Sequence, residues 1–101
     1  MKIVYDWDHN KAAANKRKHG VSFETASLVF LDANCVSEIE SHVDGEERWQ
    51  TLGLVAGVLM LMVIHTTFDE NDIEFVRIIS ARRATPRERA KYERENSSLR
   101  H

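Results

Sequence analysis

Arginines within and just after a strand-like segment near the C-terminus are the residues best suited to chemistry in this chain. Arg77 lies inside the segment 76–81, where strand interiors usually take apolar residues, and Arg82 and Arg83 follow it directly. A guanidinium stays charged and presents five donors in a fixed fork, which suits phosphate. The pattern therefore predicts a phosphate-facing surface on the last strand of a small sheet.

Charge is strongly segregated along the chain, which the net charge of −2 conceals. Residues 9–19 carry four Lys/Arg and no acid, and residues 76–94 carry seven Lys/Arg and two Glu. Residues 20–75 carry eleven acidic residues and one base, Arg48. If the two basic segments meet in space, they form a positive face that can steer a polyanion. If they do not meet, they are solvated helix faces, and charge alone leaves both interpretations open.

Length and composition indicate one small globular domain. The chain has 101 residues, of which 43% are hydrophobic and 30% charged, and we expect a domain over 1–96 with a frayed end over 97–101. The longest apolar run, 52–64, contains two glycines and is too short to span a bilayer. Charge begins at Lys2, unlike in a signal peptide. The single cysteine, Cys35, forms no internal disulfide, so we expect a cytoplasmic location.

The elements that position the arginines follow from periodicity and turn residues. Strands are predicted over residues 2–7, 35–40, 47–55, 58–67 and 73–81. Helices are predicted over residues 9–19, 22–31 and from 86 onward. The order β-α-α-β-β-β-β-α predicts an α+β fold. We expect a small, largely antiparallel sheet, with the first two helices on one face and the last against an edge or end.

Local signals mark the ends of these helices. Asp8 can cap the first helix, and Gly20 can end it in the left-handed conformation. The last helix has the clearest start, because Thr85 is a cap, Pro86 takes the first helical position and Glu88 completes a capping box. The apolar run 58–64 predicts a central strand covered on both faces.

Several separated motifs occur together over about residues 5–93. They are Trp7-Asp8 with Lys11 and Asn15, then Lys18-His19-Gly20-Val21-Ser22-Phe23, then Gly45-Glu46 with Arg48 and Gly53, then the run from Arg77 to Ala84, and finally Glu88-Arg89 with Tyr92. In this order they resemble the BrnT toxins, small ribonucleases of type II toxin–antitoxin modules. The resemblance implies a RelE-like fold, metal-independent RNA cleavage without a cofactor, and neutralisation by a cognate BrnA-like antitoxin. That antitoxin would carry a ribbon-helix-helix domain that binds operator DNA, in a complex of two toxin and two antitoxin chains.

One position departs from the family pattern. Many members place an arginine shortly after a Val-x-x-Thr segment, whereas this chain has Thr66-Thr67-Phe68. If that arginine binds phosphate, the protein is a weaker or altered nuclease.

Cleaving RNA without a metal requires three functions at one site. A base takes the proton of the 2′-hydroxyl, an acid protonates the leaving 5′-oxygen, and cations stabilise the extra charge at phosphorus. The turn acids Asp69, Glu70 and Asp72 are better explained by solvation than by metal ligation. We therefore expect no metal site.

The basic residues and His19 supply the candidate site. We expect catalytic roles for Arg77, Arg82, His19 and Arg48, and RNA-binding roles for Lys18, Arg83 and Lys11. Each has an alternative. Arg77 either clamps the scissile phosphate or pairs with a carboxylate such as Glu38, Glu40 or Glu74. His19 can instead close its helix, Lys18 can be solvated, and Arg48 can form an ion pair.

Strand alternation limits which of these residues can share a site. It places Arg77 and Arg83 on one face of the last strand and Arg82 on the other. Arg77 and Arg82 can meet only if the strand ends or bulges near residues 80–81. We expect such a break, because Thr85 must already cap the helix.

Two functions fit these residues. The first is a ribonuclease toxin that inhibits translation and growth. The second is a catalytically weak interaction domain that binds the antitoxin and acts as a transcriptional co-repressor. Phe68 favours the second, and the retained Arg77, Arg82 and Lys18-His19 favour the first. We expect His65 to be a packed histidine, and the tryptophans either to stack on bases or to belong to the core.

Overall fold

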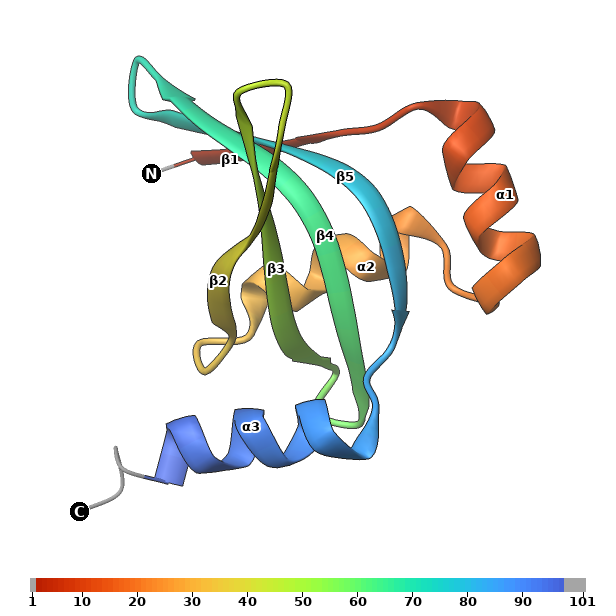
Figure 1. The fold of residues 1–101 in the computed structure, drawn as a ribbon, viewed down its shortest axis with the longest axis vertical. Helices are drawn as coiled ribbons and strands as arrows, with labels where there is room; N and C mark the ends of the chain where they lie inside the picture. The colour runs from red at the N-terminus through yellow and green to blue at the C-terminus, as the bar shows by residue number, and fades with distance from the viewer. Residues whose placement is uncertain (1, 98–101) are drawn as a thin grey trace.

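A five-stranded sheet with the strand order β1-β5-β4-β3-β2 forms the centre of the structure, a computed structural model that describes residues 2–97 (Figure 1). The strands are β1 (Lys2–Asp6), β2 (Val36–Val43), β3 (Glu46–Val55), β4 (Leu59–Glu70) and β5 (Ile73–Arg83). β1 pairs with β5 in parallel, and the other pairs are antiparallel. The α+β class and the element order agree with the sequence prediction, and the apolar β4 is central.

The helices are α1 (His9–His19), α2 (Phe23–Ser27), the 3₁₀ helix η1 (Leu28–Leu31) and α3 (Pro86–Ser97). The helix predicted over 22–31 therefore divides, tightening to 3₁₀ geometry over its last four residues. The Asp8 side chain caps α1 by accepting from the backbone N–H groups of Asn10 and Lys11. Ser97 is still helical, and the rest of the segment predicted to fray lies outside the described residues. Within residues 2–97, no helix is long and apolar enough to cross a membrane.

α1, α2 and η1 lie on one face of the sheet, as predicted. Phe23 and Val29 are fully buried there against sheet residues such as Leu61 and Ile78. Gly53 on β3 permits this contact, because a Cβ at that position would lie 2.7 Å from Cγ1 of Val29. We call this face of the sheet the helix face.

α3 covers one end of the other face. Tyr92 packs there with Leu52, Met60 and Met62 of β3 and β4. Figure 1 shows α3 crossing the sheet at the end where β3 turns into β4. The rest of this face lies beyond α3, and we call it the open face.

A bulge in β5 changes which of its residues share a face. His65 pairs with Ile78, but the next residue of β4, Ile64, pairs with Ser80, so Ile79 is the extra residue. Strict alternation would place Arg77 and Arg82 on opposite faces. The bulge places both on the face away from α1, which confirms the expected break, although the strand continues to Arg83.

Candidate functional site

A row of polar side chains crosses the open face over four neighbouring strands. Arg77 on β5 pairs with Thr66 on β4 and with Asp6 on β1. Trp49 pairs with His65, so the same register brings Arg48 on β3 level with Thr66. We call these four residues, Arg48, Thr66, Arg77 and Asp6, the arginine row. Arg48 and Arg77 are two strands apart, which separates their Cα atoms by about 10 Å.

Arg77 is the most accessible guanidinium of this row. Its Nη1 contacts Oδ2 of Asp6, and 52% of its side chain is exposed, as is 63% of that of Asp6. The carboxylate partner is therefore Asp6 rather than Glu38, Glu40 or Glu74. An exposed ion pair of this kind adds little stability, and a phosphate can compete for the same donors. Arg77 thus combines the two alternatives of the sequence, since it is paired and also open to solvent.

Arg48, the second arginine of the row, has a buried side-chain donor without a hydrogen-bond partner among the described residues. Its Nε is buried and has no hydrogen-bond partner among residues 2–97. Buried donors in folded proteins are nearly always paired, so an orphan donor on a candidate site is informative. No ion pair involving Arg48 is seen among the described residues, although Glu46 and Glu47 precede it on β3.

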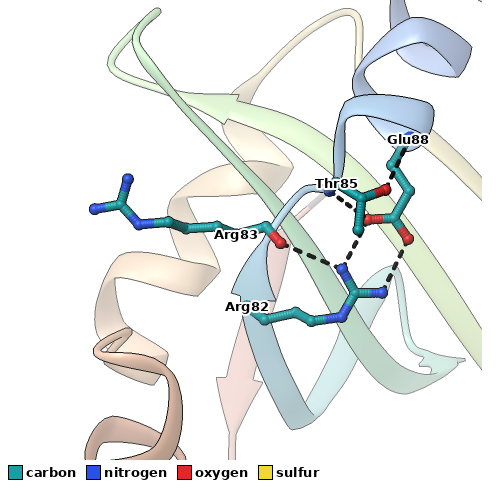
Figure 2. A network of polar contacts seen from close by, with 4 residues as sticks. All are labelled: Arg82, Arg83, Thr85 and Glu88. Atoms are coloured by element: carbon teal, nitrogen blue, oxygen red, sulfur yellow. Dashed lines mark hydrogen bonds and ion pairs between the residues drawn. The ribbon is translucent and has the colours of Figure 1, made fainter.

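Arg82 lies on the same face of the sheet as Arg77. Its guanidinium, however, is bound by Glu88 at the start of α3 (Figure 2). Its Nη1 and Nη2 donate to the two carboxylate oxygens of Glu88 at 2.7 and 2.9 Å, and Nη1 also donates to the carbonyl of Arg83 at 3.2 Å. Glu88 in turn accepts from the backbone N–H of Thr85, whose hydroxyl accepts from the Glu88 N–H. The Arg82 guanidinium keeps the pKa of Glu88 below its usual value. Arg82 thus binds the Glu88 carboxylate of the predicted Thr85–Glu88 capping box.

Arg83 points away from Arg82, toward the side on which α1 lies (Figure 2). α1 is held to β5 by Asn15, whose amide donates to the carbonyl of Ala81 at 2.9 Å and accepts from its N–H at 3.1 Å. Lys18 and His19 form the C-terminal turn of α1. Arg83, Lys18 and His19 therefore belong to the helix side of the molecule, and the structure does not bring them together with Arg77.

Arg77 instead lies near the start of α1. The pKa of Asp8 is lowered, first by the backbone N–H groups of Lys11 and Asn10 and more weakly by the charges of Lys11 and Arg77. Lys11 thus stands at the end of α1 that is nearer to the arginine row. The eleven residues of α1 span about 16 Å, so His19 is about that far from this end.

Two aromatic side chains on neighbouring strands continue the open face beyond the row. Phe68 on β4 pairs with Phe75 on β5, and their rings stack with centroids 4.9 Å apart and planes 14° apart. Phe68 is 59% exposed. An exposed aromatic surface therefore stands where the family resemblance predicts an arginine.

Two further residues considered in the sequence, Trp7 and His65, are packed inside the protein. Trp7 packs edge-on against Phe23 in the core. His65 is 4% exposed, and its Nε2 lies 2.7 Å from the Thr51 hydroxyl. Burial lowers the His65 pKa to about 4, so the ring is neutral near pH 7. Within residues 2–97, no three His, Cys, Asp or Glu side chains gather closely enough to hold a metal ion.

Sequence reasoning missed Asp6, Thr66 and Glu88 as partners in these networks. The signal for Glu88 was present, because Arg82 and Glu88 flank the Thr85 cap symmetrically in sequence. Asp6 and Thr66 had no such signal, since they meet Arg77 through strand pairing alone.

Comparisons with known proteins agree with this fold and with the motifs. Residues 7–88 match the family described as the ribonuclease toxin BrnT of type II toxin–antitoxin systems. No curated protein sequence matches the chain. Among solved structures, it is similar to the Brucella abortus ribonuclease toxin BrnT, known from a 1.1 Å crystal structure. The identity is 21%, the match covers 84% of this chain and 99% of that one, and the TM-score is 0.57, which shows a shared fold. Because the family match spans most of its length, the chain belongs to the BrnT family of ribonuclease toxins.

Proposed function

We propose that this BrnT-family protein is an endoribonuclease whose arginine row binds the scissile phosphate of cellular RNA. One observation carries the proposal, namely that the exposed Arg77 stands level with Arg48, whose buried Nε has no partner among the described residues. Two arginines whose Cα atoms lie about 10 Å apart can both reach one phosphate between them, because each side chain extends several ångströms from its strand.

The proposed reaction is attack of the 2′-hydroxyl on the adjacent phosphorus. The O2′–P bond forms, the P–O5′ bond breaks, and the proton leaves O2′ and ends on O5′. The products are a 2′,3′-cyclic phosphate and a free 5′-hydroxyl. Arg77 and Arg48 stabilise the additional negative charge that develops on the phosphoryl oxygens, which is the step where preorganised cations contribute most. We assign no metal to this chemistry.

Phe68 and Phe75 support RNA binding from the neighbouring part of the face. The exposed Phe68 ring, stacked on Phe75, offers a surface on which a base next to the scissile phosphate can stack. Base stacking tolerates any sequence, so it can replace part of the affinity that an arginine at position 68 would supply.

His19 does not lie where the proposed reaction needs it. It ends α1, whereas Arg77 influences the start of that helix. We therefore place His19, with Lys18 and Arg83, outside the reacting group, as residues available for contacts to flanking phosphates. Asp6, in contact with Arg77, is better placed to orient the guanidinium.

A partner antitoxin follows from the type II family. We propose a small antitoxin with a ribbon-helix-helix domain, in a complex of two chains of each kind, that covers the arginine row and carries the DNA contacts to the operator. Co-expression with the neighbouring gene, followed by sizing and mass determination, tests this stoichiometry.

A catalytically weak co-repressor is the alternative, favoured by two observations. Arg77 already has a carboxylate partner, and Phe68 stands near the position where the family resemblance implies an arginine. The discriminating experiment is purified protein with a defined RNA, with and without EDTA, together with induced expression in cells lacking the antitoxin. We expect cleavage to 2′,3′-cyclic ends that persists in EDTA, with growth arrest. Intact RNA and normal growth with a folded protein would support the co-repressor.

A further inference from the structure

A cavity lies on the helix face, beside η1 and away from the arginine row. It has a volume of about 210 Å³ and is lined by Phe30, Ser37, Trp49, His65, Thr67 and Glu74. Phe30 meets the His65 ring edge-on at 4.9 Å. Aromatic walls thus enclose a single carboxylate, that of Glu74, and no lysine or arginine lines the cavity.

Glu74 is held in place within this cavity. Its Oε2 accepts from the Thr67 hydroxyl at 3.0 Å. The pKa of Tyr5 is raised, mainly by burial and secondly by the charge of Glu74. The Glu74 carboxylate therefore lies close to aromatic side chains that are partly shielded from water. A fixed carboxylate among aromatic rings is an arrangement that attracts a cation, through the ion pair and through the ring faces together.

The surroundings of the cavity have the same sign of charge. Asp69 and Glu70 end β4 and Asp72 lies in the turn to β5, while Asp44 lies in the turn from β2 to β3 and Glu46 begins β3. Arg48, the single base of residues 20–75, belongs to the opposite face of the sheet. Burial lowers the His65 pKa to about 4, so this ring adds no positive charge near neutral pH. These charges, with Glu74 in the cavity itself, favour binding of a cationic group there.

We propose that this cavity receives an arginine side chain from a basic segment of a partner protein. The guanidinium pairs with Glu74 and stacks on Trp49, and its planar, weakly hydrated group suits both contacts. The polar rim of Ser37 and Thr67 hydroxyls offers further acceptors. A nucleotide fits this cavity less well, because its phosphate would lie beside the Glu74 carboxylate. The proposal does not rest on RNA cleavage, because it concerns the opposite face of the sheet.

The test uses N-acetyl-arginine amide as the probe and N-acetyl-citrulline amide as its neutral match. Binding is followed by NMR through the two tryptophan indole N–H signals. Trp49 lines the cavity, and Trp7 packs in the core against Phe23, so Trp7 serves as an internal control. We expect saturable shifts of the Trp49 signal with the arginine probe. We expect the citrulline probe to bind about tenfold more weakly, because it lacks the charge.

Two variants locate the effect. Glu74→Gln keeps the shape of the side chain and its contact with Thr67, and should weaken binding of the arginine probe about tenfold. Glu70→Gln removes one exposed acid from the end of β4, outside the cavity lining, and should change binding by less than about twofold, because exposed charges are screened. Equal binding of both probes, an equal loss in both variants, or no saturable shift of Trp49 would overturn the proposal. Tighter binding of AMP than of the arginine probe at Trp49 would assign the cavity to a nucleotide instead.

Discussion

Arg77 and Arg82 lie on the same strand and the same face of the sheet, yet they have opposite surroundings. Arg82 is gripped by both oxygens of Glu88 and by a backbone carbonyl, at the end of the sheet that α3 covers. Arg77 contacts only the exposed Asp6 among the described residues, at the end that α3 leaves open. The same residue type thus completes a helix cap in one place and faces solvent in the other. The position of α3, rather than the residue type, decides which of the two arginines is accessible to a ligand.

The ion pairs of the two arginines also differ in how far they are shielded from solvent. The Glu88 carboxylate raises the pKa of Arg82, and Arg82 lowers the pKa of Glu88. The Arg82 and Glu88 side chains are 40% and 22% exposed, which makes theirs the better shielded pair. To reach Arg82, a phosphate would have to displace Glu88 and disturb the start of α3. To reach Arg77, it would have to displace only the exposed Asp6.

The largest expected effect is loss of RNA cleavage on replacing Arg77 with Ala. If Arg77 stabilises charge at phosphorus, its removal should slow cleavage about 100- to 1000-fold, or about 2.7–4 kcal/mol, with little change in stability. Arg77→Lys should restore only part of the rate, because a point charge does not reproduce the guanidinium fork. Cleavage of purified RNA measures the rate, and thermal unfolding followed by circular dichroism is the control. Undiminished cleavage would make Arg77 a structural residue.

The second prediction concerns the buried His65, which should make the free energy of unfolding depend on pH. The His65 pKa of about 4 lies below the ordinary value of 6.5, so the unfolded chain binds more protons between these values. The free energy of unfolding should therefore fall as the pH falls from about 6.5 to 4, by up to about 3 kcal/mol.

Urea unfolding at several pH values measures this dependence. His65→Gln should remove most of the slope in that window, and Arg77→Ala should retain it. A slope that survives in His65→Gln would mean that other groups carry the pH dependence.

A smaller effect is expected from Arg82. Arg82→Ala should lower the free energy of unfolding by about 1 kcal/mol, because it removes a bidentate but partly solvent-screened pair at the start of α3. The cleavage rate of the folded protein should change far less than in Arg77→Ala. A double-mutant cycle of Arg82→Ala and Glu88→Gln measures the coupling. A loss of cleavage as large as that of Arg77→Ala would return Arg82 to the site.

The smallest effect is expected from Asp6. Asp6→Asn should change the free energy of unfolding by less than about 0.5 kcal/mol at moderate salt, because its pair with Arg77 is exposed. Chemical denaturation at low and high salt measures it. A coupling between Asp6 and Arg77 as strong as that between Glu88 and Arg82 would remove the contrast between the two ends of the sheet.

The sequence by itself determined the features that depend on neighbouring residues. The caps at Asp8 and Thr85 act over three residues, and both are found where they were predicted. The alternating and apolar runs predicted five strands and the central place of β4, because the spacing of apolar residues follows the side-chain period of a strand and the faces that it buries. The family resemblance followed from motifs in the same way and is confirmed over residues 7–88.

Only the tertiary structure decided which arginine is accessible. The parallel pairing of β1 with β5 brings Asp6 to Arg77 across 71 residues of chain, and the bulge at Ile79 turns Arg77 and Arg82 to one face. The direction of α3 then covers Arg82 and leaves Arg77 open. These outcomes depend on strand register and on how the helix packs. Both are set by the whole core, so the local sequence, which predicted the break near residues 80–81, predicted neither the Asp6 partner of Arg77 nor the direction of α3.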